Sequence, residues 1–550
     1  MKEDKKVKKA LIEIKRKLAK KYSLNKLPSN IEILNYLTEK PKDIITKPTR
    51  TISGVAPIAV MTKPFECPHV KSGVGPCIMC PGGPKSFFGD IPQSYTGKEP
   101  ATMRAVRNKF DPYLQVFNRL EQYVLLNQNF DKVEIIIMGG TFPSYPEKYQ
   151  KEFVYYIFKA LNDFSKMFFV KDKFDFVKFK KFFELPGNVH DIKRAKKVQV
   201  KVLKLKGKSS LEKEQLKNET AKVRCVALCI ETRPDYCKEE NINLMLKLGC
   251  TRVELGLQSI YNDVLDKINR GHKIEDTIRA TQLLKDSFLK VTYHIMPGLP
   301  ESDKKRDIKM FKELFSNEDF KPDMLKIYPC MVLKGTKLYN LWKAGKFKAI
   351  TTEQAAEEIC ELKRIVPKWV RISRIQRDIS IYATESGVGI TNLRQYVNDM
   401  CIKKRINCKC IRCKEPRDKE IDWNNVKLLR QDYEASNGKE IFLSFEDVKN
   451  DILLGFCRLR IPYKPFRKEI TKDSAGIREL HVYGEAVEIG KSGEIQHKGL
   501  GKQLMLEAER IAKKEFNIKK LFVISGIGVR KYYKNKLGYK KEGPYMVKEL

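Results

Sequence analysis

Residues 66–84 read ECPHVKSGVGPCIMCPGGP, and the three cysteines in this stretch are the strongest indication of the kind of fold. Nine residues separate Cys67 from Cys77, and two separate Cys77 from Cys80. Three thiolates can hold three irons of a four-iron cluster and leave the fourth iron with an open coordination position, which a catalytic metal site requires. The spacing alone also allows a structural zinc completed by His69, or a redox pair. The residues that follow favour the cluster.

From about residue 51 to 365, strand-like apolar runs alternate with helical patterns. Alternation of this kind predicts parallel strands joined by helical crossovers and closed, or partly closed, into a barrel. A loop that precedes such a region can place a metal cluster at the mouth of the barrel. The strand-like runs lie at 133–138, 223–230, 251–257, 289–296 and 324–328, with helical patterns at 262–268 and 275–286.

An insertion at about 166–215 interrupts the alternation with a mixture of lysines and phenylalanines. Basic residues interleaved with aromatic rings suit a platform for single-stranded RNA. The alternative, which we favour, is that the rings form a small core of their own. The phenylalanines concerned are Phe168, Phe169, Phe174, Phe176, Phe179, Phe182 and Phe183.

The charge balance is strongly positive, with Lys+Arg 108 against Asp+Glu 68 and a net charge of +40. Such a field attracts polyanions, and nucleic acid is the commonest large one in the cytoplasm. A lysine-rich proteome is the alternative, but in that case acidic residues rise together with lysine, and here they do not. We therefore expect a nucleic-acid partner.

Residues 1–50 form a basic leader in which Leu11, Ile14 and Leu18 recur at helical spacing. This thin apolar stripe beside many lysines fits a tRNA-binding helix, or equally a helix packed on the main domain with a solvated charged face. We find no apolar stretch long enough to cross a bilayer, and the leader lacks the apolar segment of a secretory signal. The expected compartment is cytoplasmic, with no membrane partner.

A second cysteine cluster lies in an expected connector at 366–425 and comprises Cys401, Cys408, Cys410 and Cys413. Four thiolates at short spacing favour a closed structural zinc site over a second iron–sulfur cluster. Whether Cys401 is the fourth ligand stays open, because the single residue between Cys408 and Cys410 is tight and a His or Asp from elsewhere could replace it.

From residue 426 onward a new α/β pattern begins, with strand-like runs at 441–445, 452–460 and 478–482. The segment QHKGLG at 496–501 precedes an amphipathic helix that opens near Leu500. Backbone N–H groups at a helix start make a pyrophosphate site, and glycines allow close approach. Taken alone, this segment is more often a simple helix-entry turn, and its position after the preceding strand is what favours the pyrophosphate site.

Several motifs resemble the catalytic subunit of Elongator, the family of tRNA carboxymethyluridine synthases in the radical S-adenosylmethionine superfamily. They are the first cysteine spacing, GGTFP at 139–143, ETRPDYC at 231–237 and MPGLPES at 296–302. RELHVYG at 478–484 and the final stretch at 524–550 resemble the GCN5-related N-acetyltransferase (GNAT) part of that family. The resemblance implies an α/β fold in which a partial (β/α) barrel at 51–365 is joined through a zinc-binding connector to a GNAT domain at 426–550.

The resemblance also implies cofactor sites. The first three cysteines would hold a [4Fe-4S] cluster, with Gly139, Gly140 and Thr141 against S-adenosylmethionine. Tyr533 would face the thioester of acetyl-CoA beside Tyr532, and Lys132 would reach it from the barrel domain. These three residues are the expected catalytic group. The remaining acetyl-CoA contacts would be Glu479, Leu480, His481, Val482, Gln496, Gly499, Leu500, Gly501 and Lys502.

The implied reaction forms 5-carboxymethyluridine at the wobble position of tRNA. A deoxyadenosyl radical takes a hydrogen from the acetyl methyl group, and the carbon radical adds to carbon 5 of uridine. Loss of an electron and a proton restores the ring, and thioester hydrolysis leaves the carboxymethyl group. The partners would be a tRNA anticodon stem-loop, acetyl-CoA and a reductant. Whether the chain forms a homodimer or takes accessory subunits stays open.

Two alternatives accompany this prediction. One is a protein lysine acetyltransferase whose cluster is structural, which would yield an acetylated amine without release of deoxyadenosine. The other is a tRNA-binding scaffold without catalytic activity, which would hold neither iron nor acetyl-CoA.

Overall fold

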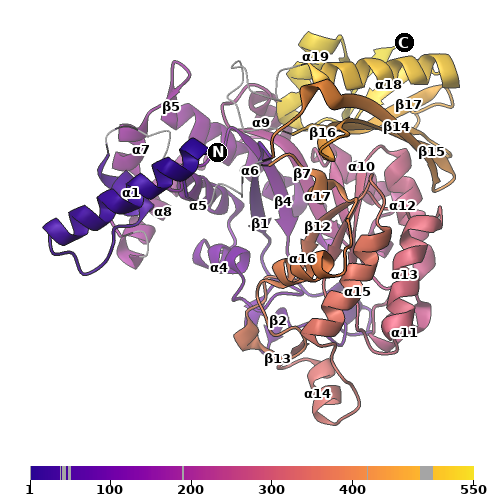
Figure 1. Ribbon diagram of the computed structural model, residues 1–550, viewed down its shortest axis with the longest axis horizontal. Helices are drawn as coiled ribbons and strands as arrows, with labels where there is room; N and C mark the ends of the chain where they lie inside the picture. Colours follow the sequence, from indigo (N-terminus) through magenta and orange to yellow (C-terminus); the bar gives the residue numbers. More distant parts are fainter. Residues whose placement is uncertain are drawn as a thin grey trace.

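The computed structural model describes residues 2–37, 39, 45–46, 51, 53–188, 191–417, 419–483 and 499–550. Within them the chain forms two seven-stranded sheets, one before and one after residue 425 (Figure 1). Three small two-stranded sheets accompany them: β2 (Gly83–Ser86) with β3 (Gly89–Ile91), β5 (Phe169–Val170) with β6 (Lys173–Phe174), and β11 (Val332–Leu333) with β13 (Thr384–Ser386).

The first large sheet is parallel and open. Its strands lie in the order β1-β4-β7-β8-β9-β10-β12, and every pairing within it is parallel. Since β1 and β12 each have one neighbour, the barrel is only partly closed, which confirms the predicted fold class. The strands are β1 (Ala56–Met61), β4 (Lys132–Met138), β7 (Arg224–Thr232), β8 (Arg252–Gln258), β9 (Lys290–Ile295), β10 (Met324–Ile327) and β12 (Arg371–Ile375).

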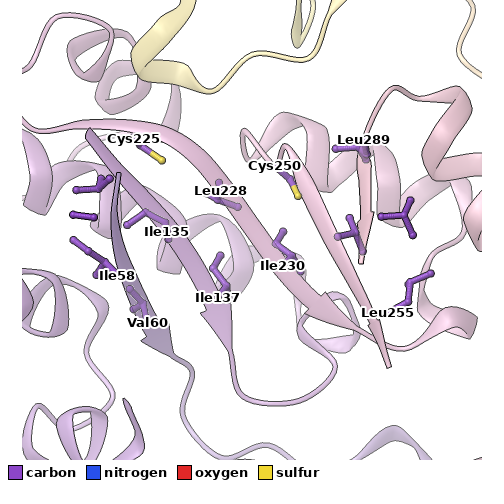
Figure 2. Close-up of a cluster of buried hydrophobic side chains, with 14 of the residues drawn as sticks. Ile58, Val60, Ile135, Ile137, Cys225, Leu228, Ile230, Cys250, Leu255 and Leu289 are labelled. Carbon is purple, nitrogen blue, oxygen red and sulfur yellow. The ribbon is translucent and has the colours of Figure 1, made fainter. Parts of the chain in front are cut away.

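Helical crossovers cover the outer face of this sheet. Alternate residues such as Ile58, Ile135, Leu228 and Leu255 are fully buried and gather on that face (Figure 2). The other face of the same strands carries polar side chains, which is where the site lies. The helices between β1 and the second sheet, apart from those of the insertion, are α3 (Pro68–Lys71), α4 (Pro100–Arg107), α5 (Pro112–Leu125), α6 (Glu147–Phe168), α10 (Glu239–Lys247), α11 (Asn262–Lys267), α12 (Ile274–Asp286), α13 (Lys304–Ser316), α14 (Lys337–Lys343), α15 (Thr352–Ile365), α16 (Leu393–Lys403) and α17 (Ile411–Lys414).

The phenylalanines of the insertion form a core. Phe168, Phe179 and Phe183 are 0% exposed and pack together, with ring centroids 4.6 to 5.8 Å apart. A buried ring cannot stack on a base, so the RNA-platform interpretation is wrong for these residues. The insertion folds as β5, β6, α7 (Phe176–Phe182), α8 (Ile192–Leu205) and α9 (Leu211–Asn218).

The leader begins with a long basic helix, α1 (Lys2–Lys21), followed by α2 (Asn30–Tyr36). On α1 the side chains of Ile14 and Leu18 are 53% and 43% exposed, so the predicted apolar stripe does not pack them on the main domain. None of the described helices has the length and apolarity that crossing a bilayer requires.

The connector expected at 366–425 differs from the structure at its start. Strand β12 pairs with β10, with Met324 opposite Arg371, and so belongs to the first sheet. The run RISRI has only two apolar residues, Ile372 and Ile375, so the sequence offered no apolar stretch that would mark it as a sheet strand.

The second large sheet has the order β14-β15-β16-β17-β18-β20-β19 and is antiparallel except between β17 and β18. Helix α18 (Leu500–Phe516) packs on it and buries Leu504, Met505 and Ala508, as its periodicity predicts. The other elements are β14 (Val426–Ala435), β15 (Gly438–Asp447), β16 (Ile452–Ile461), β17 (Ser474–Val482), β18 (Lys520–Val523), α19 (Arg530–Leu537), β19 (Lys540–Glu542) and β20 (Tyr545–Glu549).

Buried ion pairs join the two sheets. Arg478 of β17 donates to both carboxylate oxygens of Asp323 at 2.8 and 2.5 Å, and both side chains are 0% exposed. Arg460 of β16 donates to Asp286 at 2.6 Å, and Glu440 accepts from Arg460 and Arg478 at 3.0 and 3.1 Å. Because Asp323 immediately precedes β10, these contacts fix β17 relative to the first sheet.

Candidate functional site

The first three cysteines lie at the carboxyl end of the parallel strands. They line a cavity of about 150 Å³ together with Gly140, Thr141 and other residues that follow β4, β7 and β8. Cys67 precedes α3 as its N-cap, and a turn brings the Cys80 N–H to the Cys77 carbonyl at 2.9 Å. The predicted position at the barrel mouth is therefore where the structure places them.

The spacing of the sulfur atoms distinguishes a cluster from a single ion. Among the described residues, those whose ligand atoms all lie within 4.8 Å of one another do not include Cys67, Cys77 and Cys80. A four-iron cube keeps its thiolates apart because each binds a different iron, so this arrangement fits a cluster better than one zinc. His69, the alternative fourth zinc ligand, is buried, and neither ring nitrogen has a hydrogen-bond partner among the described residues.

Groups that stabilise thiolates surround these cysteines. Arg270 Nη1 lies 3.5 Å from Cys77 Sγ, and the backbone N–H of Ser94 donates to Cys80 Sγ at 3.3 Å. Burial raises the pKa of the Cys80 thiol, and the neighbouring Cys77 adds to that effect. Binding to iron would offset this cost, since metal ligation requires the thiolate.

Gly139 and Gly140 end strand β4 in a conformation that favours glycine. Gly139 has φ +123°, and a Cβ there would lie 2.3 Å from Thr62 Oγ1. Tyr145 donates to the Gly139 carbonyl at 2.6 Å, which holds the turn in place. Gly140 and Thr141 consequently expose backbone groups to the cavity, where a ligand amine can reach them.

Charged residues form the floor of the cavity, and sequence reasoning did not identify them. Glu254 is 0% exposed and lies 2.8 Å from His294 Nε2. Lys326 Nζ forms an ion pair with Glu254 and lies 3.5 Å from Glu231, which in turn accepts from Tyr95 at 3.2 Å. In these strands polar residues recur at every second position among apolar ones, and this pattern could have revealed them.

Lys326 stabilises the ionised form of Glu254. Burial alone would raise the pKa of Glu254, but Lys326 and Arg252 hold it well below its ordinary value. Glu231, Glu254 and His294 have the spacing of a metal site. The Lys326 ammonium already balances these carboxylates, so a divalent ion there would face an unfavourable charge.

The predicted acetyl-CoA strand, β17, lies at the opposite end of the half barrel, against the amino ends of its strands. Glu479 accepts from Arg458 at 2.9 Å, and Lys290 at the start of β9 lies 3.6 Å away. Burial opposes ionisation, yet Lys290 and Arg458 lower the pKa of Glu479 to about 2. The His481 ring stacks with the Phe456 ring, at a centroid distance of 5.9 Å.

The start of α18 offers the predicted anion site. Its first N–H groups have no partner within the helix, and Gly501 lies close to Leu480 and Val482. A Cβ at Gly501 would be 3.4 Å from Val482 and 3.6 Å from the Tyr532 hydroxyl. Leu500 is buried and Lys502 exposed. Gln496 lies outside the described residues.

The environments of the two tyrosines of α19 are the reverse of those that the sequence predicted. Tyr533 is 6% exposed and packs in the domain core, with its ring 6.0 Å from that of Tyr539. Tyr532 is 39% exposed and has its hydroxyl beside Gly501. The sequence could not assign the pair because both fit the same local pattern.

Lys132 begins β4 at the end of the half barrel that faces the second sheet. It is half-buried, and burial lowers its pKa while Asp131 opposes that shift. Nearby, Gly528 approaches Arg224 so closely that a Cβ would lie 2.5 Å from the arginine Cβ, so the two domains touch here.

The second cysteine cluster is only partly as expected. Cys408, Cys410 and Cys413 have ligand atoms within 4.8 Å of one another, which suits a single ion. Cys401 is instead 3.2 Å from Cys360, measured between sulfur atoms. Lys363 Nζ donates to Cys413 at 3.4 Å. Sequence analysis did not identify this pair, because Cys360 and Cys401 lie far apart in the chain.

Comparisons with known proteins cover most of the chain. Residues 75–311 match the Radical SAM superfamily, 322–401 the Radical_SAM C-terminal domain, and 409–539 the Acetyltransferase (GNAT) family. The tRNA uridine(34) acetyltransferase of Methanocaldococcus infernus is 53% identical, covering 95% of this chain and 92% of its own. Elongator complex protein 3 of Saccharomyces cerevisiae is 41% identical, with coverages of 97% and 91%. The solved structure of archaeal Methanocaldococcus infernus Elp3 with an N-terminal deletion has a TM-score of 0.72 at 48% identity, covering 91% of this chain and 100% of that one.

Proposed function

This chain belongs to the family of Elongator complex protein 3 and the tRNA uridine(34) acetyltransferases, and from that membership we propose that it is an acyltransferase that modifies the wobble uridine of tRNA. The finer proposal is that the product is 5-carboxymethyluridine. The observation that supports it is a cysteine-lined cavity in one domain of a chain whose second domain matches the acetyltransferase (GNAT) family, with buried ion pairs holding the two domains together. A plain acetyltransferase would have no use for the cysteine cavity.

Cys67, Cys77 and Cys80 would hold the [4Fe-4S] cluster, which with S-adenosylmethionine at its open iron supplies a carbon radical. The surrounding residues would bind and orient S-adenosylmethionine. The Gly140–Thr141 backbone would receive the amine of S-adenosylmethionine, and Glu231 would be a further hydrogen-bond acceptor in the same cavity.

Acetyl-CoA would lie between β17 and α18. The first N–H groups of α18, which have no partner within the helix, would bind the pyrophosphate, and Gly501 would let the backbone approach it. The Tyr532 hydroxyl, rather than that of Tyr533, would donate a hydrogen bond to the thioester or to the leaving thiolate, and its position beside Gly501 supports this assignment. Lys132 would contact the same ligand from the first domain.

Zinc is proposed at Cys408, Cys410 and Cys413, where three thiolates converge. The ion would stabilise the segment between α16 and β14, which has few apolar residues of its own. Cys401 would then be spared as a ligand by its contact with Cys360.

Incubation of anaerobically reconstituted protein with dithionite, S-adenosylmethionine, acetyl-CoA and tRNA carrying wobble uridine tests the proposal. We expect 5-carboxymethyluridine by nucleoside mass spectrometry, together with deoxyadenosine. An acetylated lysine without deoxyadenosine would indicate a protein acetyltransferase instead. Binding of tRNA by protein that holds neither iron nor acetyl-CoA would indicate a scaffold.

Replacing Lys326 by Met is expected to make deoxyadenosine formation depend on pH. Without the ammonium, burial raises the pKa of Glu254 and Arg252 is the main cation left to oppose that rise, so the carboxylate loses its charge at a higher pH than in the natural protein. The rate should therefore fall as the pH is lowered and recover as it is raised, by about tenfold for each unit by which the pKa rises. K326R keeps the charge and should keep the natural profile. An equal loss at every pH would show that Lys326 is merely structural.

A further inference from the structure

A small hydrophobic core closes one side of the cysteine cavity. Leu333, Ile379 and Ala383 are buried there, and Phe88 packs against them. Ile379 also lines the cavity, so this core is part of its rim. Figure 1 shows β2 and β13, the strands next to it, at the end of the molecule away from β17 and α18.

Two aromatic side chains beside this core face solvent, and we call them the rim aromatics: Phe87 and Tyr382. Phe87 is 65% exposed although the next residue, Phe88, packs inward, with ring centroids 5.2 Å apart. Tyr382 is 90% exposed, more than any other large hydrophobic side chain in the described part of the chain. Single exposed aromatics are ordinary, but two anchored in one rim are not.

The ring of Tyr382 is free to bind a ligand. Within the described residues, its only hydrogen bond is from its backbone N–H to Ser380 Oγ, and no other ring stacks on it. Its neighbours hold it in place, since the Ala383 N–H donates to the Ser380 carbonyl at 2.9 Å and Thr384 begins β13. The backbone that carries Tyr382 is therefore held at the rim, and most of the surface of its ring is accessible.

The rim is also basic. Arg377 lines the cavity, donates to the Ser94 carbonyl and has no carboxylate partner among the described residues. Arg374 pairs with Asp378, and Lys334 lies 3.3 Å from Glu385, so these two cations are balanced. The excess of positive charge at Arg377 suits phosphates, and aromatic rings among cations are the usual platform for unpaired bases.

We propose that the rim aromatics stack on unpaired anticodon-loop bases next to the wobble uridine. The inference rests on the proposed function and adds how the RNA is held. Drawing one nucleotide into the cavity breaks its stacking with its neighbours, and the exposed rings of Tyr382 and Phe87 replace that stacking. Stacking of this kind recognises an unpaired loop and ignores a duplex.

Binding of an anticodon stem-loop RNA to the full-length holoprotein, measured by fluorescence anisotropy, tests this. Y382A should weaken binding about 5- to 100-fold, the range expected when one base loses an aromatic partner. Y382F keeps the ring and should bind as the natural protein does. Y463A removes another exposed tyrosine, 60% exposed and outside the rim, and should have no effect. F87A should resemble Y382A.

Two controls keep the outcomes distinct. Affinity for a fully paired RNA of equal length, and deoxyadenosine formation without RNA, should be unchanged in Y382A. If Y382A binds the stem-loop like the natural protein, the inference is overturned. It is also overturned if Y382A loses product only with a protein reductant and not with dithionite, because the rim would then receive a protein. Failure of the natural protein to modify uridine would reject the proposed function. The comparison of stem-loop binding between Y382A and the natural protein would still test whether Tyr382 stacks on RNA bases.

Discussion

Replacing Cys77 by serine is expected to remove iron from the first cluster and to abolish formation of deoxyadenosine and of 5-carboxymethyluridine. An alcohol is a poor iron ligand compared with a thiolate, and Cys77 is the thiol that Arg270 contacts at 3.5 Å. Iron analysis, visible absorption and nucleoside mass spectrometry measure the loss. The protein should still fold and bind tRNA, because Cys77 is not part of the core of either large sheet.

Cys250→Ser is the matched control. Cys250 is buried and donates to the Arg252 carbonyl at 3.1 Å, a bond that serine can also make. This variant should keep its iron and its product. A C77S protein with the natural iron content and deoxyadenosine yield would show that the three cysteines are not the cluster ligands.

Replacing Asp323 by Asn is expected to lower the free energy of unfolding by about 3–5 kcal/mol, the usual cost of breaking one buried ion pair. The substitution leaves Arg478 buried opposite a neutral amide. Product should fall further than either acetyl-CoA binding or deoxyadenosine formation, because β17 would no longer be held against the first sheet. Thermal unfolding and the three separate assays measure these effects.

Asp263→Asn supplies a comparison with similar geometry at the surface. Arg306 donates to both oxygens of Asp263 at 2.8 Å, but the side chains are 34% and 59% exposed. Exposed pairs contribute about 0–1 kcal/mol, so this variant should be nearly as stable as the natural protein. Equal destabilisation by D263N and D323N would contradict a special role for the buried pair.

The same ion pair predicts a dependence of stability on pH. Burial would raise the pKa of Asp323, but Arg478 and Lys285 hold it far below its ordinary value. The group therefore stabilises the fold fully above the unfolded pKa of about 3.9 and progressively less as the pH falls below that value. D323N should remove this component of acid sensitivity.

The sequence predicted the features that depend on local pattern. Alternating runs predicted the parallel strands, and the spacing of Cys67, Cys77 and Cys80 predicted their common cavity. The periodicity after Gly499 predicted α18. Each of these signals lies within a few residues, where helix and strand periods are visible.

Features that depend on contacts between distant residues escaped prediction. The ion pair between Glu254 and Lys326 requires the registers of β8, β9 and β10, and Arg478 meets Asp323 only after both domains have folded. The choice between Tyr532 and Tyr533 depended on how α19 packs. Such contacts leave no periodic trace in the chain.

The buried charges between the two domains bear on how the protein can be dissected. A fragment beginning at residue 426 would carry Arg458, Arg460 and Arg478 but lack Asp286 and Asp323, which neutralise them. The fragment would expose these three guanidinium groups on the surface that the first domain normally covers, with Glu440 and Glu479 as their remaining acidic partners. Activities measured on such a fragment would therefore not represent those of the intact chain.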